Sequence, residues 1–310
     1  MLPETWTILK VLKWTRAYFE SHHIEQPRAA AEILLAHTLG VGRVDLYVQY
    51  DRPLESHELE LFKGFIQRRI RREPVAYIVG KKEFWSMALK VTSDVLIPRP
   101  ETETLVEAAL MIVPPERGPA PLNILDLGTG SGGIVLAMAS ERSEHRFYAV
   151  DCSERALAVA QDNARMLELD KAVTFLHGNW FAPVRDRGRY FDVILSNPPY
   201  IASREMEVLP PEIAQHEPRE ALEGGSDGLE AIRLIIKEAS YYLVPGGWLL
   251  FEIGHDQWAA VEKLIAGSGV YREWAVIRDY SGHDRVVRTR TRGDNTRRLQ
   301  NYVASPKIVC

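Results

Sequence analysis

The sequence predicts an α/β protein, in which a small helical N-terminal domain is joined by a β-hairpin to a doubly wound β-sheet domain. Two observations carry most of this prediction. Apolar side chains recur at helical spacing over about the first 72 residues, and from Leu122 onward short apolar runs alternate with helical segments. Alternating strands and helices are typical of parallel sheets, because each crossover helix returns the chain to the edge from which the next strand starts.

Three helices are predicted for the N-terminal domain, residues 1–73. The first contains Ile8, Leu9, Val11, Leu12, Tyr18 and Phe19. Pro27 suits the start of the second helix and Gly40 its end, because a first turn leaves the missing proline N–H unused and glycine tolerates the backbone reversal after a last turn. The third helix begins near Glu55. It ends in four arginines that suit a helix C-terminus and are expected in solvent: Arg68, Arg69, Arg71 and Arg72.

Residues 74–98 are predicted to form the β-hairpin linker, because Val75–Gly80 and the apolar residues that alternate after it show strand-like patterning. The main domain is assigned to residues 99–288. It begins with a predicted helix over Thr102–Val113, which ends at the proline- and glycine-rich loop Pro114–Pro121.

Five apolar strands follow in the main domain: Leu122–Leu127, Arg146–Val150, Val173–His177, Phe191–Ser196 and Trp248–Ile253. Two later segments, Glu273–Arg278 and Arg285–Arg288, are predicted to complete one edge of the sheet. Trp248 and Glu252 are expected to be a core and an edge residue of the fifth strand. Residues 289–310 are rich in arginine and poor in apolar side chains, so they are predicted to be a disordered tail.

Composition and charge narrow the class of protein. The 310 residues are 46% hydrophobic and 26% charged, which is ordinary for a globular protein. A formal charge of −4 gives no basic field that would attract nucleic acid. Cys152 and Cys310 lie far apart in the sequence, so we expect neither a disulfide framework nor a zinc-binding pair, and we also expect no secretion leader or membrane span. We expect a monomeric, cytoplasmic enzyme with no metal centre and no membrane or direct nucleic-acid contact.

A glycine-rich turn follows the first strand of the main domain. Gly128, Gly130 and Gly133 fit the pattern G-x-G-x-x-G, and Asp151 lies about 20 residues further on, at the end of the next strand. Glycines let the backbone approach a ligand, and a carboxylate accepts hydrogen bonds from ribose hydroxyls. The pattern alone fits either a dinucleotide or S-adenosylmethionine. Asp126 favours S-adenosylmethionine, because its carboxylate could serve the amino-acid moiety of that cofactor, whereas it would repel a pyrophosphate.

A second motif, Asn197-Pro198-Pro199-Tyr200, follows the fourth strand, at the edge where open α/β sheets bind ligands. An amide nitrogen is a poor nucleophile because its lone pair is delocalised. The side-chain oxygen of Asn197 and the carbonyl of Pro198 would each accept one N–H, and Tyr200 would pack against the flat group. Positioning and electrostatics would then carry the rate. Together the two motifs predict methyl transfer from S-adenosylmethionine to a planar nitrogen.

Further segments match one family over nearly the whole chain, up to Arg288. They are Ile97–Glu103, Asp126–Gly132, Asn179–Phe181, Asn197–Ile201, Glu217–Leu222, Asp227-Gly228, Arg278–Tyr280, Gly282 and Arg285. With these segments the chain resembles the protein-(glutamine-N5) methyltransferases that modify peptide chain release factors. The resemblance implies a seven-stranded, Rossmann-like class I methyltransferase domain and S-adenosyl-L-methionine as cofactor. It also implies, as substrate, the glutamine of the Gly-Gly-Gln motif in class 1 release factors.

The resemblance also implies roles for individual residues. The cofactor site would contain Gly128, Thr129, Gly130, Ser131, Gly132, Asp151, Trp180 and Asn197, with Asp151 on the ribose and Trp180 beside the adenine. The substrate glutamine would be held by Asn197, Pro198, Pro199 and Tyr200. Of these, Asn197, Pro198 and Tyr200 would be the catalytic residues.

Two other substrates stay open, namely a ribosomal-protein glutamine and the N6 nitrogen of adenine in nucleic acid. The sister family that modifies a ribosomal protein resembles Pro-Arg-Ser-Pro in its linker, whereas here Pro100–Glu103 follow Arg99, as in the release-factor family. The acidic net charge and the lack of a basic stripe weigh against nucleic acid. A non-catalytic nucleotide-binding module is a further alternative, which the intact Asn197 and Tyr200 oppose.

Overall fold

The computed structural model describes residues 5–115, 118, 120–185 and 191–292. The chain divides into two compact units. One contains the residues up to Lys81 together with Pro210–His216, and the other contains Lys82–Leu209 and the residues from Glu217 onward. The sequence assigned Pro210–His216 to the main domain, so its place in the N-terminal unit is a finding of the structure. The boundaries predicted at residues 73 and 98 stay predictions.

The N-terminal unit is helical, with elements α1 (Ile8–Ser21), α2 (Pro27–Leu39), α3 (Asp45–Val48), α4 (Ser56–Ile70), α5 (Val75–Val79) and α10 (Pro211–Ala214). The apolar faces of α1 to α5 enclose a core that includes Phe19, Leu34, Leu35 and Phe62. The Thr7 side chain accepts from the Lys10 amide and caps α1. The predicted helix start at Pro27 and the stop at Gly40 both lie where the sequence places them.

Two expectations for this unit are wrong. Val75–Val79 forms a short helix and not a strand, because Pro74 occupies its N-cap and Gly80 ends it with φ of 72°. A five-residue apolar run fits either structure by pattern alone, so the flanking residues decide. The arginines at the end of α4 are not all in solvent either. Arg69 is buried, with 5% of its surface exposed, and it pairs with Glu212 of α10 at 2.9 Å.

The second unit contains a seven-stranded sheet with the order β5-β4-β3-β6-β7-β9-β8. The strands are β3 (Asn123–Leu127), β4 (Arg146–Asp151), β5 (Val173–His177), β6 (Phe191–Ser196), β7 (Leu243–Glu252), β8 (Tyr271–Arg278) and β9 (Asp284–Thr291). The first five pair in parallel, and β9 is antiparallel to both of its neighbours. A separate hairpin is formed by β1 (Lys81–Phe84) and β2 (Met87–Lys90). The α/β fold class is confirmed.

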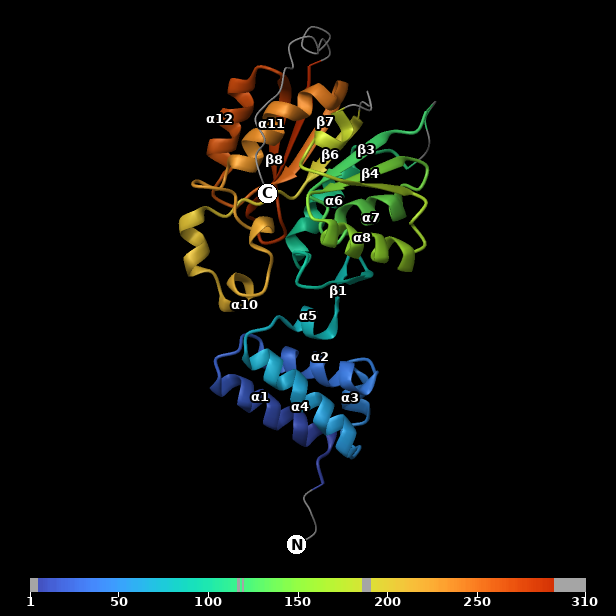
Figure 1. The fold of residues 1–310 in the computed structure, drawn as a ribbon, viewed down its shortest axis with the longest axis vertical. Helices are drawn as coiled ribbons and strands as arrows, with labels where there is room; N and C mark the ends of the chain where they lie inside the picture. Colours follow the sequence, from blue (N-terminus) through green and yellow to red (C-terminus); the bar gives the residue numbers. More distant parts are fainter. Residues whose placement is uncertain (1–4, 116–117, 119, 186–190, 293–310) are drawn as a thin grey trace. The chain divides into compact units, whose positions relative to one another are not determined.

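Helices cover both faces of the sheet (Figure 1). On one face lie α11 (Glu230–Tyr242) and α12 (Trp258–Ser268); on the other lie α6 (Glu103–Leu110), α7 (Gly133–Glu141) and α8 (Glu154–Met166). Successive side chains of β6 enter opposite cores: Ile194 packs with the first group, and Val193 and Leu195 pack with the second. Shorter elements are η1 (Pro100–Thr102), α9 (Ala182–Arg185), η2 (Ser203–Val208) and η3 (Arg219–Ala221).

The predicted tail begins too early in the sequence. Residues 289–291 belong to β9, where Thr289 and Thr291 are fully buried. Arginines occupy the alternate positions Arg288 and Arg290, so this strand has the composition of a solvated segment although one of its faces is buried. Residues 293–310 of the predicted tail lie outside the described residues. None of the helices that the structure describes is long and apolar enough to cross a membrane.

Candidate active site

The glycine-rich turn between β3 and α7 has an unusual backbone. Gly128 and Gly130 have φ values of 70° and 55°, which side-chain-bearing residues rarely adopt. The amides of Gly128 and Thr129 both donate to the Val150 carbonyl, at 2.9 and 3.0 Å, and this fixes the turn against β4. A Cβ at Gly128 or Gly130 would meet no atom within 4 Å, so open space lies beside the turn.

Asp151 ends β4 and links that strand to the turn. Its Oδ2 accepts from the Gly130 amide at 2.8 Å, and its Oδ1 accepts from the Ser153 amide at 2.9 Å. Burial raises the pKa of the Asp151 carboxyl, and these backbone hydrogen bonds oppose that rise. Each carboxylate oxygen has a further lone pair, so Asp151 can still accept hydrogen bonds from a ligand.

A cavity of about 570 Å³ opens beside these residues and lies wholly within the second unit. Of the predicted site residues, those that line it are Gly128, Thr129, Gly130, Ser131, Asp151, Trp180, Asn197 and Pro199. Gly132, Pro198 and Tyr200 do not line it. Gly132 serves packing instead, because a Cβ there would lie 3.0 Å from Leu136 Cδ1. Asp126 is completely buried and accepts from the Thr129 hydroxyl, so it does not line the cavity, and its expected place beside the cofactor is wrong.

The charges around the cavity fit S-adenosylmethionine better than a dinucleotide. Five carboxylates line it: Asp94, Asp151, Glu220, Glu223 and Glu230. The two guanidinium groups in the lining are both paired, Arg99 with Glu217 and Arg219 with Glu223, each at 2.6 Å. A negative lining attracts a sulfonium and an ammonium group and repels a pyrophosphate. The cavity also falls within the usual size range of small-molecule sites, roughly 300–1,000 Å³.

The Asn-Pro-Pro-Tyr turn follows β6 and is held from several sides. The Ile201 amide donates to the Leu222 carbonyl at 2.9 Å, and the Gly224 amide donates back to the Ile201 carbonyl at 2.8 Å. Gln257 donates to the Tyr200 carbonyl at 2.9 Å. The turn is therefore a rigid part of the second unit. The segment that begins at Glu217 is also fixed, because the buried Glu217 carboxylate accepts from the Arg99 guanidinium at 2.6 Å.

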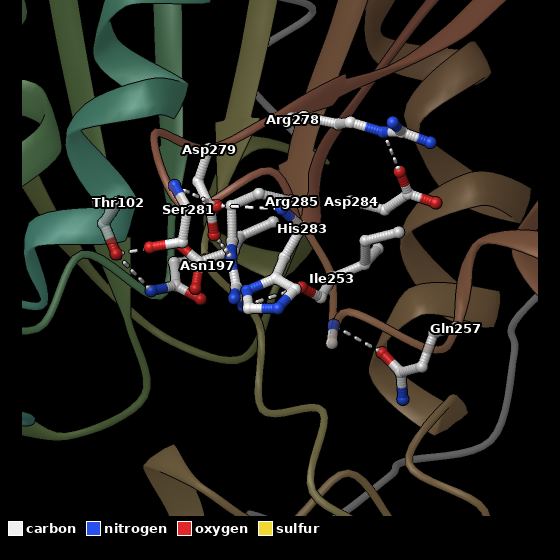
Figure 2. Close-up of polar contacts among 12 residues, drawn as sticks. Thr102, Asn197, Ile253, Gln257, Arg278, Asp279, Ser281, His283, Asp284 and Arg285 are labelled. Atoms are coloured by element: carbon white, nitrogen blue, oxygen red, sulfur yellow. Dashed lines mark hydrogen bonds and ion pairs between the residues drawn. The ribbon is translucent and has the colours of Figure 1, made fainter.

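Two residues to which the sequence assigned no role at the site, Thr102 and Glu252, lie behind this turn. Glu252, at the end of β7, is 1% exposed, and its oxygens accept from the Thr102 hydroxyl at 2.7 Å and the Tyr200 hydroxyl at 3.1 Å. Thr102 in turn accepts from the Asn197 amide nitrogen at 3.2 Å (Figure 2). The expected edge position of Glu252 is wrong. The usable signal was a single charged residue at the end of an otherwise apolar strand.

Tyr200 is oriented differently from the expectation. Its hydroxyl donates to Glu252, and its ring packs against the apolar core under the sheet. Burial raises the pKa of the Tyr200 hydroxyl, and the neighbouring Glu252 carboxylate raises it further, so the group stays protonated. Its predicted contact with a substrate amide stays a prediction. Trp180 lines the cavity half-buried, with φ of 46°.

The fold and the site define the class of protein, a methyltransferase. Residues 109–225 match the family model of the methyltransferase small domain, and residues 10–80 match that of the PrmC N-terminal domain. A methyltransferase from Pyrococcus furiosus has a similar fold, with a TM-score of 0.51 at 19% identity, covering 73% of this chain and 98% of that one.

Known relatives then identify the family. The release factor glutamine methyltransferase of Geobacter sulfurreducens is 44% identical over 285 residues, which cover 92% of this chain and 97% of the relative. That of Coxiella burnetii is 45% identical over 261 residues, which cover 84% and 91%. The chain belongs to the release factor glutamine methyltransferase family. It is an S-adenosyl-L-methionine-dependent methyltransferase, so the predicted enzyme class and cofactor are confirmed.

Proposed function

We propose that the protein methylates the N5 amide nitrogen of the glutamine in the Gly-Gly-Gln motif of class 1 peptide chain release factors. One observation supports the chemistry above all others: Asn197 lines the cofactor cavity with its amide nitrogen already bonded to Thr102. The amide oxygen of Asn197 is left to accept an N–H from a second amide. The names of the relatives support release factors as the source of that amide.

We assign one group of residues to cofactor binding and another to substrate binding. The Gly128–Ser131 turn and Asp151 would hold the cofactor, with the Asp151 carboxylate on its ribose hydroxyls, and Trp180 would flank the adenine. When bound, the cofactor supplies a methyl group on a positively charged sulfur. The carboxylates of the lining stabilise that positive charge in the bound state.

Asn197 and Pro198 would orient the substrate nitrogen. If the Asn197 side-chain oxygen and the Pro198 carbonyl each accept one N–H, both hydrogens are held away from the methyl donor. The lone pair is then turned toward it, and hydrogen bonds that increase electron density on nitrogen strengthen as transfer proceeds. The amide nitrogen gains one methyl group and loses one proton. That proton leaves after transfer, when the nitrogen is strongly acidic, so water suffices as its acceptor.

We also propose that the protein acts in the cytoplasm as a monomer and binds no nucleic acid. Release factors act on the ribosome during termination, and this supports a cytoplasmic site of action. Support for the absence of nucleic-acid binding comes from the net charge of −4.

Methyl transfer to a purified class 1 release factor tests the proposed function. With isotopically labelled cofactor, mass spectrometry should place one methyl group on the glutamine of Gly-Gly-Gln, and a release factor with that glutamine changed to alanine should stay unlabelled. Asn197→Ala should lower kcat about 100-fold or more while cofactor affinity stays within about threefold. Label on a ribosomal protein or on adenine in a cell extract, with none on the release factor, would overturn the substrate assignment.

A further inference from the structure

A chain of three polar side chains runs from the interior of the second unit to the cofactor cavity. It begins at Glu252 at the end of β7, passes through Thr102 at the end of η1, and ends at Asn197 after β6. Thr102 and Asn197 both line the cavity, whereas Glu252 does not. Figure 2 shows Thr102 and Asn197 pointing toward one another.

Counting protons in this chain determines which way each group must face. A threonine hydroxyl carries one proton, and an ionised carboxylate can only accept. At 2.7 Å from Glu252 Oε2, the Thr102 hydroxyl uses its one hydrogen to donate a hydrogen bond to the carboxylate. Toward Asn197 the same hydroxyl can therefore only accept, so the Asn197 NH₂ group must face Thr102, as it does at 3.2 Å.

The environment of Glu252 supplies partners for its negative charge. Tyr200 donates to Oε1 at 3.1 Å, and the Arg285 guanidinium attracts the carboxylate electrostatically. Arg285 is held in place by Asp279 at 3.1 Å and by the Ile253 carbonyl at 3.2 Å. Burial, with a smaller contribution from the charge of Glu101, raises the pKa of the Glu252 carboxyl above its usual value, although Thr102, Arg285 and Tyr200 act to lower it.

We propose that Glu252 is a positioning residue that acts through Thr102 to fix the amide orientation of Asn197, so that oxygen and not nitrogen faces the substrate. This inference rests on the proposed amide chemistry of the turn. With the amide reversed, the Asn197 NH₂ would meet the NH₂ of the substrate, and two donors cannot bond to one another. The substrate nitrogen would then keep only one of its two proposed acceptors, the Pro198 carbonyl.

Four variants test the proposal in the full-length protein. Glu252→Gln replaces the carboxylate with a group of the same shape that can itself donate to Thr102, which frees the hydroxyl proton to turn to Asn197. Thr102→Val keeps the shape of the side chain and removes the hydroxyl. Each should lower kcat about 100-fold, with the KM for the cofactor changed less than about threefold. Thr102→Ser restores the hydroxyl and should recover kcat to within about threefold of the wild type.

Thr104→Val is the matched control. Thr104 lies two residues further along, is equally buried at 4% exposure, and its hydroxyl has no hydrogen-bond partner among the described residues. Its kcat should stay within about twofold of the wild type. Equal losses in Thr102→Val and Thr104→Val would show that the effect is packing, and would overturn the proposal.

The pH profile of kcat is a second test, because a purely structural contribution of Glu252 to folding would not change its acidic limb. In the wild type, kcat should fall as pH drops through the folded-state pKa of Glu252, because a protonated Glu252 can donate to Thr102. The Glu252→Gln protein should lack this acidic limb. A Thr102→Val protein with wild-type kcat, or an unchanged acidic limb in Glu252→Gln, overturns the inference. If Glu252→Gln fails to bind cofactor, the valine and serine variants of Thr102 decide.

Failure of the proposed function gives a different result from failure of this inference. If the wild type methylates some other amide or amine and leaves release factors unlabelled, the substrate assignment fails. The kcat ratios among the four variants can then be measured on that other substrate. On that substrate the outcomes named above still decide the role of Glu252: wild-type kcat in Thr102→Val, equal losses in Thr102→Val and Thr104→Val, or an unchanged acidic limb in Glu252→Gln would count against it.

Discussion

At the scale of single residues, Asp151 has the most direct expected effect on cofactor binding. Its two oxygens accept from the Gly130 and Ser153 amides, and the residue lines the cavity. Asp151→Asn replaces one accepting oxygen with a donor and removes the charge. The cofactor affinity, measured by calorimetry, should fall about tenfold to hundredfold, the range for losing hydrogen bonds to a charged group. Asp170→Asn changes an exposed carboxylate on the same unit and should leave the affinity unchanged; equal losses in both variants would exclude a local role.

The sequence predicted the residues that line the cavity wherever they belong to a recognisable motif. The Gly128–Ser131 turn, Asp151, Trp180 and Asn197 all line one cavity, as one would expect from the ends of neighbouring parallel strands. It did not identify Thr102 or Glu252 as partners of Asn197. They lie 95 and 55 residues from it in the sequence, and only the sheet order brings β7 beside β6. Pairwise contacts of this kind carry no local pattern.

At the scale of elements, the start of α7 depends on one glycine. Gly132 has φ of 84°, and a Cβ there would lie 3.0 Å from Leu136 and 3.3 Å from Ala160. Gly132→Ala should therefore lower the free energy of unfolding by about 1–3 kcal/mol through backbone strain and crowding. In contrast, Gly267 lies inside α12 with nothing within 4 Å of a Cβ. Gly267→Ala should raise the free energy of unfolding by up to about 1 kcal/mol. Urea denaturation measures both variants. A Gly132→Ala protein with the wild-type free energy of unfolding would contradict the crowding at this position.

Elements were predicted most accurately where composition and burial agree. The parallel strands β4 and β6 are apolar because both of their faces are covered, and their predicted bounds agree with the structure to within one residue. The antiparallel β9 alternates arginine with buried threonine, so its last three residues were missed. The helix at Val75–Val79 was misread, because five apolar residues between Pro74 and Gly80 have no distinguishing period.

At the scale of the whole molecule, the N-terminal unit includes a segment from far along the chain. Pro210–His216 belongs to it, between two stretches of the second unit that carry the Asn-Pro-Pro-Tyr turn and Glu217. Glu212 in this segment binds Arg69 at 2.9 Å and Arg72 at 3.3 Å, and the Arg71 carbonyl lies 3.2 Å from the His216 ring. The unit is therefore closed by ion pairs that span about 140 residues of sequence.

Breaking the buried ion pair should loosen this segment selectively. Arg69→Gln leaves Glu212 with Arg72 as its one remaining cationic partner among the described residues. The ion pair that is lost is largely buried, because the Arg69 side chain is only 6% exposed. The free energy of unfolding of the N-terminal unit should fall by about 2–4 kcal/mol, because a buried charge loses its partner. Hydrogen exchange of the Pro210–His216 amides should accelerate in parallel. Arg71→Gln, which changes an exposed arginine at the same helix end, should shift stability by less than about 0.5 kcal/mol. If both variants exchange at the wild-type rate, the ion pair does not hold the segment, and its place in the unit rests on apolar packing alone.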